Sequence, residues 1–188
     1  MTEKERFLKN IFNYIGKNGW ENFSLENFSE DNKVKIKKIN KYFDSNDQLI
    51  TCFVSTINDK TFNEISNDSV DITSVKDTLF EFIMIRFDKL TPYKDGLREI
   101  FTHSKKNPFL INLISKKVFN FIEFIFDLSG AKKNFVLDKI SINILFIIYL
   151  YVFNVWLGDE TSEMSKTMSE LNTCLTKAED LVKKINLF

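Results

Sequence analysis

The sequence predicts an all-α protein, and three observations lead to that prediction. Among 188 residues there are only five Gly and two Pro, so little of the chain is suited to sharp turns. Most of these residues stand between long segments in which apolar side chains recur at helical spacing. Leu, Ile and as many as 20 Phe supply the apolar positions. A chain of this length can bury a sizeable core as one large or two small domains.

The first expected helix covers residues 2–17. Its apolar side chains, from Phe7 to Ile15, recur on one face, which is the pattern of an amphipathic helix. Thr2 and Glu5 have the spacing of a capping box, in which each side chain bonds to the other residue's backbone N–H. Two Gly residues then end the helix, and Ser24 is suited to cap a short second one.

A basic third helix is expected at residues 34–41. The net charge of the chain is zero, so any attraction to nucleic acid must be local, and this stretch has no acid to oppose it. Lysines there would hold phosphates without reading sequence, whereas Asn40 and Asn32 can bond to adenine edges. A solvated helix face is the alternative. The residues expected to contact DNA are Lys33, Lys35, Lys37, Lys38, Asn40 and Lys41.

Long helices are expected in the rest of the chain, with Pro92, Gly96 and Gly130 marking joints between them. The helix at 75–90 is apolar nearly all round, which is typical of a central, buried helix. Most of the Phe should be plain core, but a few side chains are expected to border an apolar ligand cavity, and Arg86 is a candidate for binding an acidic ligand headgroup. The expected helices are 47–65, 75–90, 108–128, 140–157 and 161–186, with a polar loop at 66–74. The expected pocket residues are Phe80, Met84, Phe87, Phe119 and Phe124.

Residues 140–157 form the most apolar segment of the chain. They are just long enough to span a membrane, but Asn143 and Asn154 lie within them, and amide groups are unfavourable in hydrocarbon. We therefore expect a buried interface helix and no transmembrane segment.

The last expected helix carries a heptad stripe of apolar residues. Together with residues 140–157, it predicts a helical hairpin that forms a four-helix bundle with a second copy. The alternative is an amphipathic helix at a membrane surface, although the acids on its polar face oppose this. The stripe consists of Met164, Met168, Leu171, Leu175, Ala178, Val182 and Ile185. The expected dimer interface consists of Phe146, Leu150, Phe153, Leu171, Leu175 and Val182.

Enzyme chemistry has little support in the sequence. His103 is the only histidine, so no catalytic triad or multi-histidine metal site can be assembled. There is no Gly-rich phosphate loop, and Cys52 and Cys174 are expected to be reduced thiols in helices. We expect no enzyme, cofactor or metal. The N-terminus lacks the order of a signal peptide, which favours a bacterial cytoplasmic location.

The layout of the chain resembles the TetR superfamily of regulators. The Gly19-Trp20 turn and the elements after it look like the family's helix-turn-helix domain: Ile39, Tyr42-Phe43, Asp44-Ser45-Asn46 and Leu49. An alpha-proteobacterial branch of TetR architecture is similar in further phrases: Asp77-Thr78-Leu79-Phe80, Met84-Ile85-Arg86-Phe87-Asp88, Tyr93-Lys94-Asp95-Gly96-Leu97-Arg98, Val155-Trp156-Leu157-Gly158-Asp159 and Lys166-Thr167-Met168. That branch is similar to the ubiquinone-biosynthesis accessory proteins, which keep the fold and bind isoprenoid lipids.

The resemblance implies a TetR-like fold of about nine helices. Residues 1–46 would be a helix-turn-helix, DNA-binding domain, and residues 47–188 a ligand-binding and dimerisation domain. The implied function is a one-component transcriptional regulator that binds DNA as a homodimer and is controlled by an apolar small molecule. The alternative is a lipid-binding accessory protein of ubiquinone biosynthesis, peripheral to the inner membrane, with a vestigial helix-turn-helix.

Four positions in the expected helix-turn-helix domain depart from the family pattern. Lys33 replaces a usual Gly, and Lys35 replaces a small polar residue. Asn40 stands where a Tyr is usual, and Asn46 where a phosphate-binding Lys is usual. The loss of that Tyr and that Lys favours the lipid-binding alternative, whereas the gain of two lysines favours the regulator.

Overall fold

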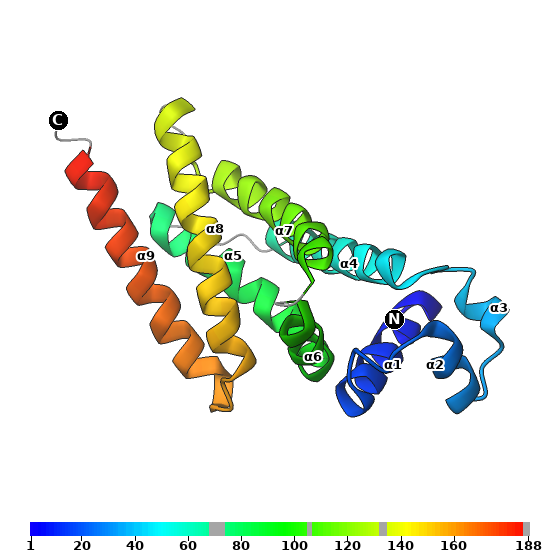
Figure 1. The fold of residues 1–188 in the computed structure, drawn as a ribbon. Coiled ribbons are helices and arrows are strands. Elements are labelled where there is room, and N and C mark those ends of the chain that lie inside the picture. Colours follow the sequence, from blue (N-terminus) through cyan, green and yellow to red (C-terminus); the bar gives the residue numbers. More distant parts are fainter. Residues whose placement is uncertain (68–73, 105–106, 132–134, 186–188) are drawn as a thin grey trace. The chain divides into compact units, whose positions relative to one another are not determined.

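The computed structural model describes residues 1–67, 74–104, 107–131 and 135–185, and within these ranges every regular element is helical. Figure 1 shows the helices along the chain. Their bounds are α1 Glu3–Asn18, α2 Leu25–Asp31, α3 Ile36–Ile39, α4 Asn46–Asn67, α5 Val75–Leu90, η1 Thr91–Tyr93, α6 Lys94–Ser104, α7 Pro108–Leu128, α8 Phe135–Leu157, η2 Ser162–Met164 and α9 Ser165–Ile185.

The chain divides into two compact units. The first unit comprises Met1–Asp59 and Lys89–Lys117, and the second comprises Lys60–Asp88 and Val118–Phe188. The three helices of the expected helix-turn-helix domain thus share a unit with the first part of α4, with η1 and α6, and with the first part of α7.

The start of α1 confirms the expected capping box. The Glu5 N–H donates to Thr2 Oγ1 at 3.2 Å, and the Thr2 N–H donates to Glu5 Oε2 at 2.7 Å. The apolar face of α1 is buried in the first unit. There Phe12 packs on Phe53 with ring centroids 4.1 Å apart and meets Tyr93 edge-on at 5.5 Å.

Gly96 lies inside α6, and the prediction that it marks a joint between helices is wrong. Its lack of a side chain instead allows α1 and α6 to approach closely. A Cβ atom added at Gly96 would lie 2.4 Å from the carbonyl oxygen of Phe12, a distance that real Cβ atoms essentially never show. Gly16 of α1 faces the same contact, since a Cβ atom there would lie 2.8 Å from Cβ of Asp95.

The basic third helix is much shorter than expected, because α3 covers only Ile36–Ile39. Before it, Lys33 adopts a left-handed conformation with φ +52°. Val34 is then held outside the helix: its N–H donates to the Ser29 carbonyl at 3.0 Å, and its carbonyl accepts from the Ser29 hydroxyl at 2.6 Å. The Val34 carbonyl thus accepts from a side chain of α2, and the first helical bond after it is that of the Lys38 N–H to the Lys35 carbonyl at 2.9 Å.

Stacked aromatic rings form the core of the second unit. Phe87 of α5 is fully buried. Its ring lies 5.7 Å from that of Tyr149 and 5.5 Å from that of Trp156, both on α8. The expected burial of α5 is confirmed, because residues 82–87 are all buried. Figure 1 shows α8 and α9 running side by side as an antiparallel hairpin, and these two helices are in contact.

A buried carboxylate fixes the turn of this hairpin. Asp159 Oδ2 accepts from the Thr167 N–H at 2.8 Å and from the Thr167 hydroxyl at 2.6 Å. Its other oxygen accepts from the N–H and hydroxyl of Thr161. The turn delays α9, which begins at Ser165 and not at 161. Met164 therefore lies in η2 with φ +55°, outside the helical stripe to which it was assigned.

One described helix is long and apolar enough to cross a membrane by length and composition. It is Leu137–Leu157, with a mean hydropathy of 2.0. Within this segment, 39% of the apolar window is buried by the chain itself.

Candidate functional site

The expected DNA-binding residues form one exposed basic patch at and beside α3. Residues 32–43 contain five lysines and no acid. Lys37 and Lys38 lie within α3, while Lys35 precedes it and Lys41 follows it. All six expected residues are solvent-exposed, so every one of the side chains is accessible to a ligand. We call Lys33, Lys35, Lys37, Lys38, Asn40 and Lys41 the α3 patch.

One acid borders the α3 patch in the first unit. The Tyr42 hydroxyl donates to Glu3 Oε2 at 2.7 Å, and the Lys41 ammonium lies 5.5 Å from the centre of the Tyr42 ring. The hydrogen bond from Tyr42 lowers the pKa of Glu3, and the nearby charges of Lys41 and Lys38 lower it further. Glu3 thus stays ionised, and its bond to Tyr42 ties the start of α1 to the end of the basic segment.

The expected interface residues of α8 and α9 fall into two groups. On α8, Leu150 is 37% exposed, and Phe146 and Phe153 are half-buried at the border of the same face. On α9, Leu171 and Leu175 are buried by the chain itself and offer no surface to a second copy. Val182 lines a cavity described below. Leu171 and Leu175 therefore pack α9 against its own chain, whereas Met168 of the same stripe is 39% exposed.

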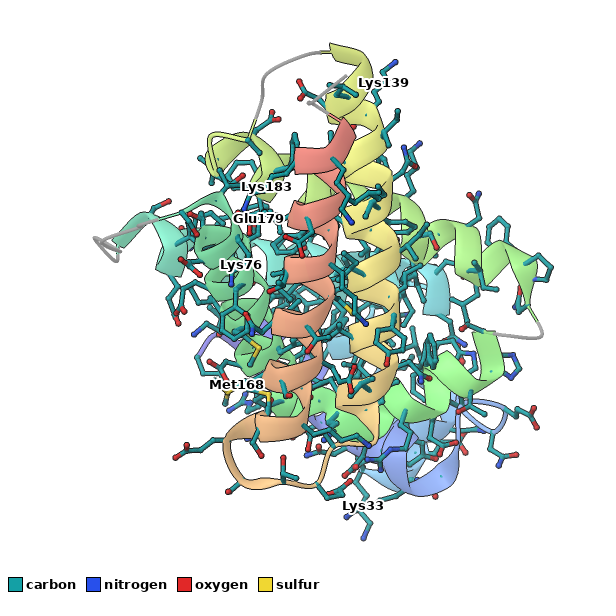
Figure 2. All side chains as sticks on the ribbon, turned by 90° about the vertical axis from the view of Figure 1, so that its left-hand side faces the viewer. Lys33, Lys76, Lys139, Met168, Glu179 and Lys183 are labelled. Atoms are coloured by element: carbon teal, nitrogen blue, oxygen red, sulfur yellow. The ribbon has the colours of Figure 1, made fainter. Side chains whose placement is uncertain are left out.

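The outward face of α8 carries apolar residues that the sequence analysis did not select. They are Ile140, Ile147 and Tyr151, which lie beside the expected Leu150, and Ile147 is the most exposed of them at 65%. Their spacing places them on one side of the helix. Leu181 of α9 is exposed as well. Figure 2 shows α8 and α9 side by side, facing the viewer. Because α8 is apolar all round, its sequence pattern could not indicate which side lies outward.

An apolar groove of about 250 Å³ lies within the second unit, among α5, the end of α7, α8 and α9. Aliphatic side chains form most of its wall, and lysines 76 and 183 with Glu179 provide charges. The main apolar residues are Leu79, Phe126, Ile144, Leu145, Ile148 and Leu175.

None of the five expected pocket residues lines this groove. Phe87 and Met84 are buried in the core, and Phe80 is half-buried. Phe119 packs edge-on against Phe146 with centroids 5.3 Å apart. Phe124 lies 4.1 Å from Phe62 and is 39% exposed. The groove lies on the α9 side of α5 and α8, and its wall consists mainly of smaller aliphatic side chains, whereas the expected residues were four Phe and one Met.

Arg86 is buried in the second unit with only 2% of its surface exposed. Its Nε donates to the Tyr149 hydroxyl at 2.9 Å, and the guanidinium carbon lies 4.2 Å from the centre of the Phe121 ring. Arg86 is not among the residues of the groove. A role for it in binding the headgroup of a ligand there has no geometric support.

The side chains that are candidates for enzyme chemistry do not form a common site. In the first unit, His103 Nδ1 lies 3.4 Å from Glu21 Oε1 beside a polar hollow of about 270 Å³. Cys52 and Cys174 are both free thiols. Among the residues that the structure describes, no group of three or more His, Cys, Asp and Glu is placed to hold a metal ion.

Comparison with known proteins shows that the chain is similar in fold to solved structures. No protein-family model matches the sequence, and no curated protein matches it. Among solved structures, a TetR transcriptional regulator from Nitrosomonas europaea is similar with a TM-score of 0.79 at 18% identity, over 95% of this chain and 99% of that one. Salmonella enterica GusR has a TM-score of 0.67 at 15% identity, over 97% and 98% of the two chains.

A TetR transcriptional regulator from Rhodococcus sp. RHA1 has a TM-score of 0.62 at 16% identity, over 93% of each chain. The chain therefore has the all-α TetR fold, as the sequence predicted. The alternative of a lipid-binding accessory protein of ubiquinone biosynthesis finds no support among these structures.

Proposed function

We propose that this chain is a homodimeric, non-enzymatic transcriptional regulator in the cytoplasm. In this proposal residues 1–46 bind DNA through the α3 patch, and residues 47–188 bind an apolar small molecule and a second copy. Regulators with a similar fold support it. The observation that carries it is the α3 patch, in which five lysines and one asparagine are exposed at the expected recognition helix.

The α3 patch is suited to phosphate contacts. Lysines that neutralise phosphates release condensed counterions, and several such contacts together dominate the affinity for DNA. The lysines flank and occupy a short helix, so they can reach the backbone on either side of a groove while Asn40 meets a base edge. A dimer would present two such patches to the two halves of a palindromic site.

The outward face of α8 supports the homodimer. A row of exposed apolar side chains on one helix is unusual for a monomer and marks an interaction surface. Two copies related by a two-fold axis would bring the same face of each α8 together. Ile140, Ile147, Leu150 and Tyr151 would then be covered in both copies.

Fluorescence anisotropy tests the proposal directly. The chain is titrated against labelled DNA from the region upstream of its own gene and against scrambled DNA, across a salt series. We expect tight binding that prefers the upstream DNA. The double variant Lys35→Glu, Lys38→Glu should abolish this binding and keep the helical circular dichroism spectrum of the parent.

A matched control makes the same change of charge at another place on the chain. The double variant Lys177→Glu, Lys184→Glu alters two exposed lysines of α9 and should bind DNA as the parent does. Equal, weak binding to both DNAs would contradict the regulator, and so would full binding by the Lys35→Glu, Lys38→Glu protein.

A further inference from the structure

The groove of the second unit has a long, narrow apolar body. On α8 its wall extends from Ser141 to Ile148, and on α9 from Leu175 to Lys183. At 1.5 Å per helical residue, these walls are roughly 10 Å and 12 Å long. A methylene group has nearly the volume of a liquid water molecule, roughly 30 Å³. The space of about 250 Å³ therefore suits an alkyl chain of medium length.

Charged groups gather at one edge of this groove. Figure 2 shows Lys76, Glu179 and Lys183 spaced along one side of α9, whereas Lys139 lies at the start of α8. Two lysines and one glutamate line the groove, so its lining carries a net positive charge. An apolar body with cations at one edge complements an amphiphile with an anionic head.

Both lysines are weakly held by groups of the chain. The Lys76 ammonium donates to the Asn172 amide oxygen at 3.3 Å and lies 3.9 Å from Asp77 Oδ1. Asp77 accepts a shorter bond of 2.6 Å from the Ser74 hydroxyl. Lys183 pairs with Glu179 at 3.2 Å, but its side chain is 65% exposed, and exposed pairs contribute little. A carboxylate can therefore take a place beside either ammonium group without breaking a buried ion pair.

We propose that this groove binds a medium-chain alkyl carboxylate. The alkyl tail lies between α5, α8 and α9 against Leu79, Ile144, Ile148 and Leu175, and the carboxylate accepts a hydrogen bond from Lys76 or Lys183. This inference adds the class of the apolar ligand to the proposed function. It rests on that function only where the ligand is taken to regulate DNA binding.

Isothermal titration calorimetry without DNA tests the binding. The probes are sodium decanoate below its critical micelle concentration, neutral 1-decanol and decylammonium. We expect decanoate to bind at least tenfold more tightly than decylammonium. The double variant Lys76→Gln, Lys183→Gln should weaken decanoate binding at least tenfold and leave 1-decanol binding within twofold.

Two further variants separate the head from the tail. Lys139→Gln removes one exposed lysine of α8 outside the groove and should bind decanoate as the parent does. Ala178→Phe fills the groove from α9 and should abolish binding of decanoate and 1-decanol alike. Circular dichroism checks that each variant keeps the helical content of the parent.

Three results would overturn the inference. They are no heat from decanoate at millimolar concentration, equal affinity for decanoate and decylammonium, and unchanged decanoate binding in the Lys76→Gln, Lys183→Gln protein. Because no DNA is present, a chain that fails to bind DNA can still bind decanoate, so failure of this inference is distinguishable from failure of the proposed function.

Discussion

Gly96 of α6 meets the backbone of Phe12 of α1 so closely that the two helices have no room for a Cβ atom between them. A Cβ at Gly96 would lie 2.4 Å from the Phe12 carbonyl oxygen and 3.0 Å from its carbonyl carbon. These atoms belong to a helix backbone, so they cannot move aside as the end of a flexible side chain would.

Gly96→Ala should therefore destabilise the chain by separating α1 from α6. Overpacking of this kind costs about 1–3 kcal/mol of unfolding free energy, and a rigid backbone contact favours the upper end. Urea denaturation followed by circular dichroism measures the effect. Gly158→Ala is the control, since a Cβ there would meet only the Val155 carbonyl oxygen at an ordinary 3.7 Å. Equal stability of the two variants would contradict the close contact.

Asp159 makes stability depend on pH in the acid range. Burial alone would raise the pKa of its carboxyl, but hydrogen bonds from Thr161 and Thr167 outweigh burial and hold the pKa well below the ordinary value of 3.8. A depressed pKa adds stability that is fully present above the ordinary value and is lost as the pH falls through the folded value. We expect the unfolding free energy to decline below about pH 4 for this reason.

Asp159→Asn should remove this part of the acid decline. It should also lower stability at neutral pH by about 1–3 kcal/mol, because an amide cannot accept four hydrogen bonds as the carboxylate does. Urea titrations at a series of pH values from neutral downward measure both effects. An Asp159→Asn protein with the same pH profile as the parent would show that other carboxylates govern acid unfolding.

The number of phosphates that the α3 patch contacts can be read from the salt dependence of DNA binding. Each lost phosphate contact reduces the slope of log affinity against log salt by about 0.9. The double variant Lys35→Gln, Lys38→Gln should therefore have a slope lower by roughly 2 if each lysine holds one phosphate. Anisotropy titrations at four or more salt concentrations measure it, and Lys177→Gln, Lys184→Gln should keep the parent slope.

The outward face of α8 should be needed for dimerisation. Ile147→Glu places a charge where the proposed dimer is apolar, and a buried, unpaired carboxylate is strongly unfavourable. We expect the variant to sediment as a monomer at micromolar concentration, where the parent sediments as a dimer. Ser169→Glu, at an exposed position of α9, should remain dimeric. A monomeric parent would refute the interface.

The sequence predicted the bounds of α1, α4, α5 and α7 to within two residues because local signals determine them. Periodic apolar residues predicted α5, and Pro108 marked the first residue of α7. The capping residues of α1 and α2 are local as well: Thr2 and Ser24 accept the expected backbone N–H bonds. Such signals lie within a few residues of each other, so they can be read before any tertiary contact is known.

The sites could not be predicted to the same degree, because they depend on contacts between distant segments. Gly96 looks like a helix breaker until Phe12 is seen against it. Leu171 and Ile147 are both apolar residues in predicted interface helices, yet the fold buries the first and exposes the second. The groove wall combines residues of four helices, and its smaller members, such as Ala178, carry no signal along the chain.

At Lys33, the stability of the folded chain and the affinity for DNA favour different residues. Its left-handed backbone, with φ +52°, is one that Gly adopts freely and a side chain with a Cβ adopts at a penalty. Lys33→Gly should raise the unfolding free energy by about 1 kcal/mol and also weaken DNA binding by one phosphate contact. Lys33→Ala should weaken binding equally without the gain in stability. The chain thus keeps a positively charged residue in a turn where Gly would be more stable. We expect a variant selected for heat resistance alone to lose this lysine.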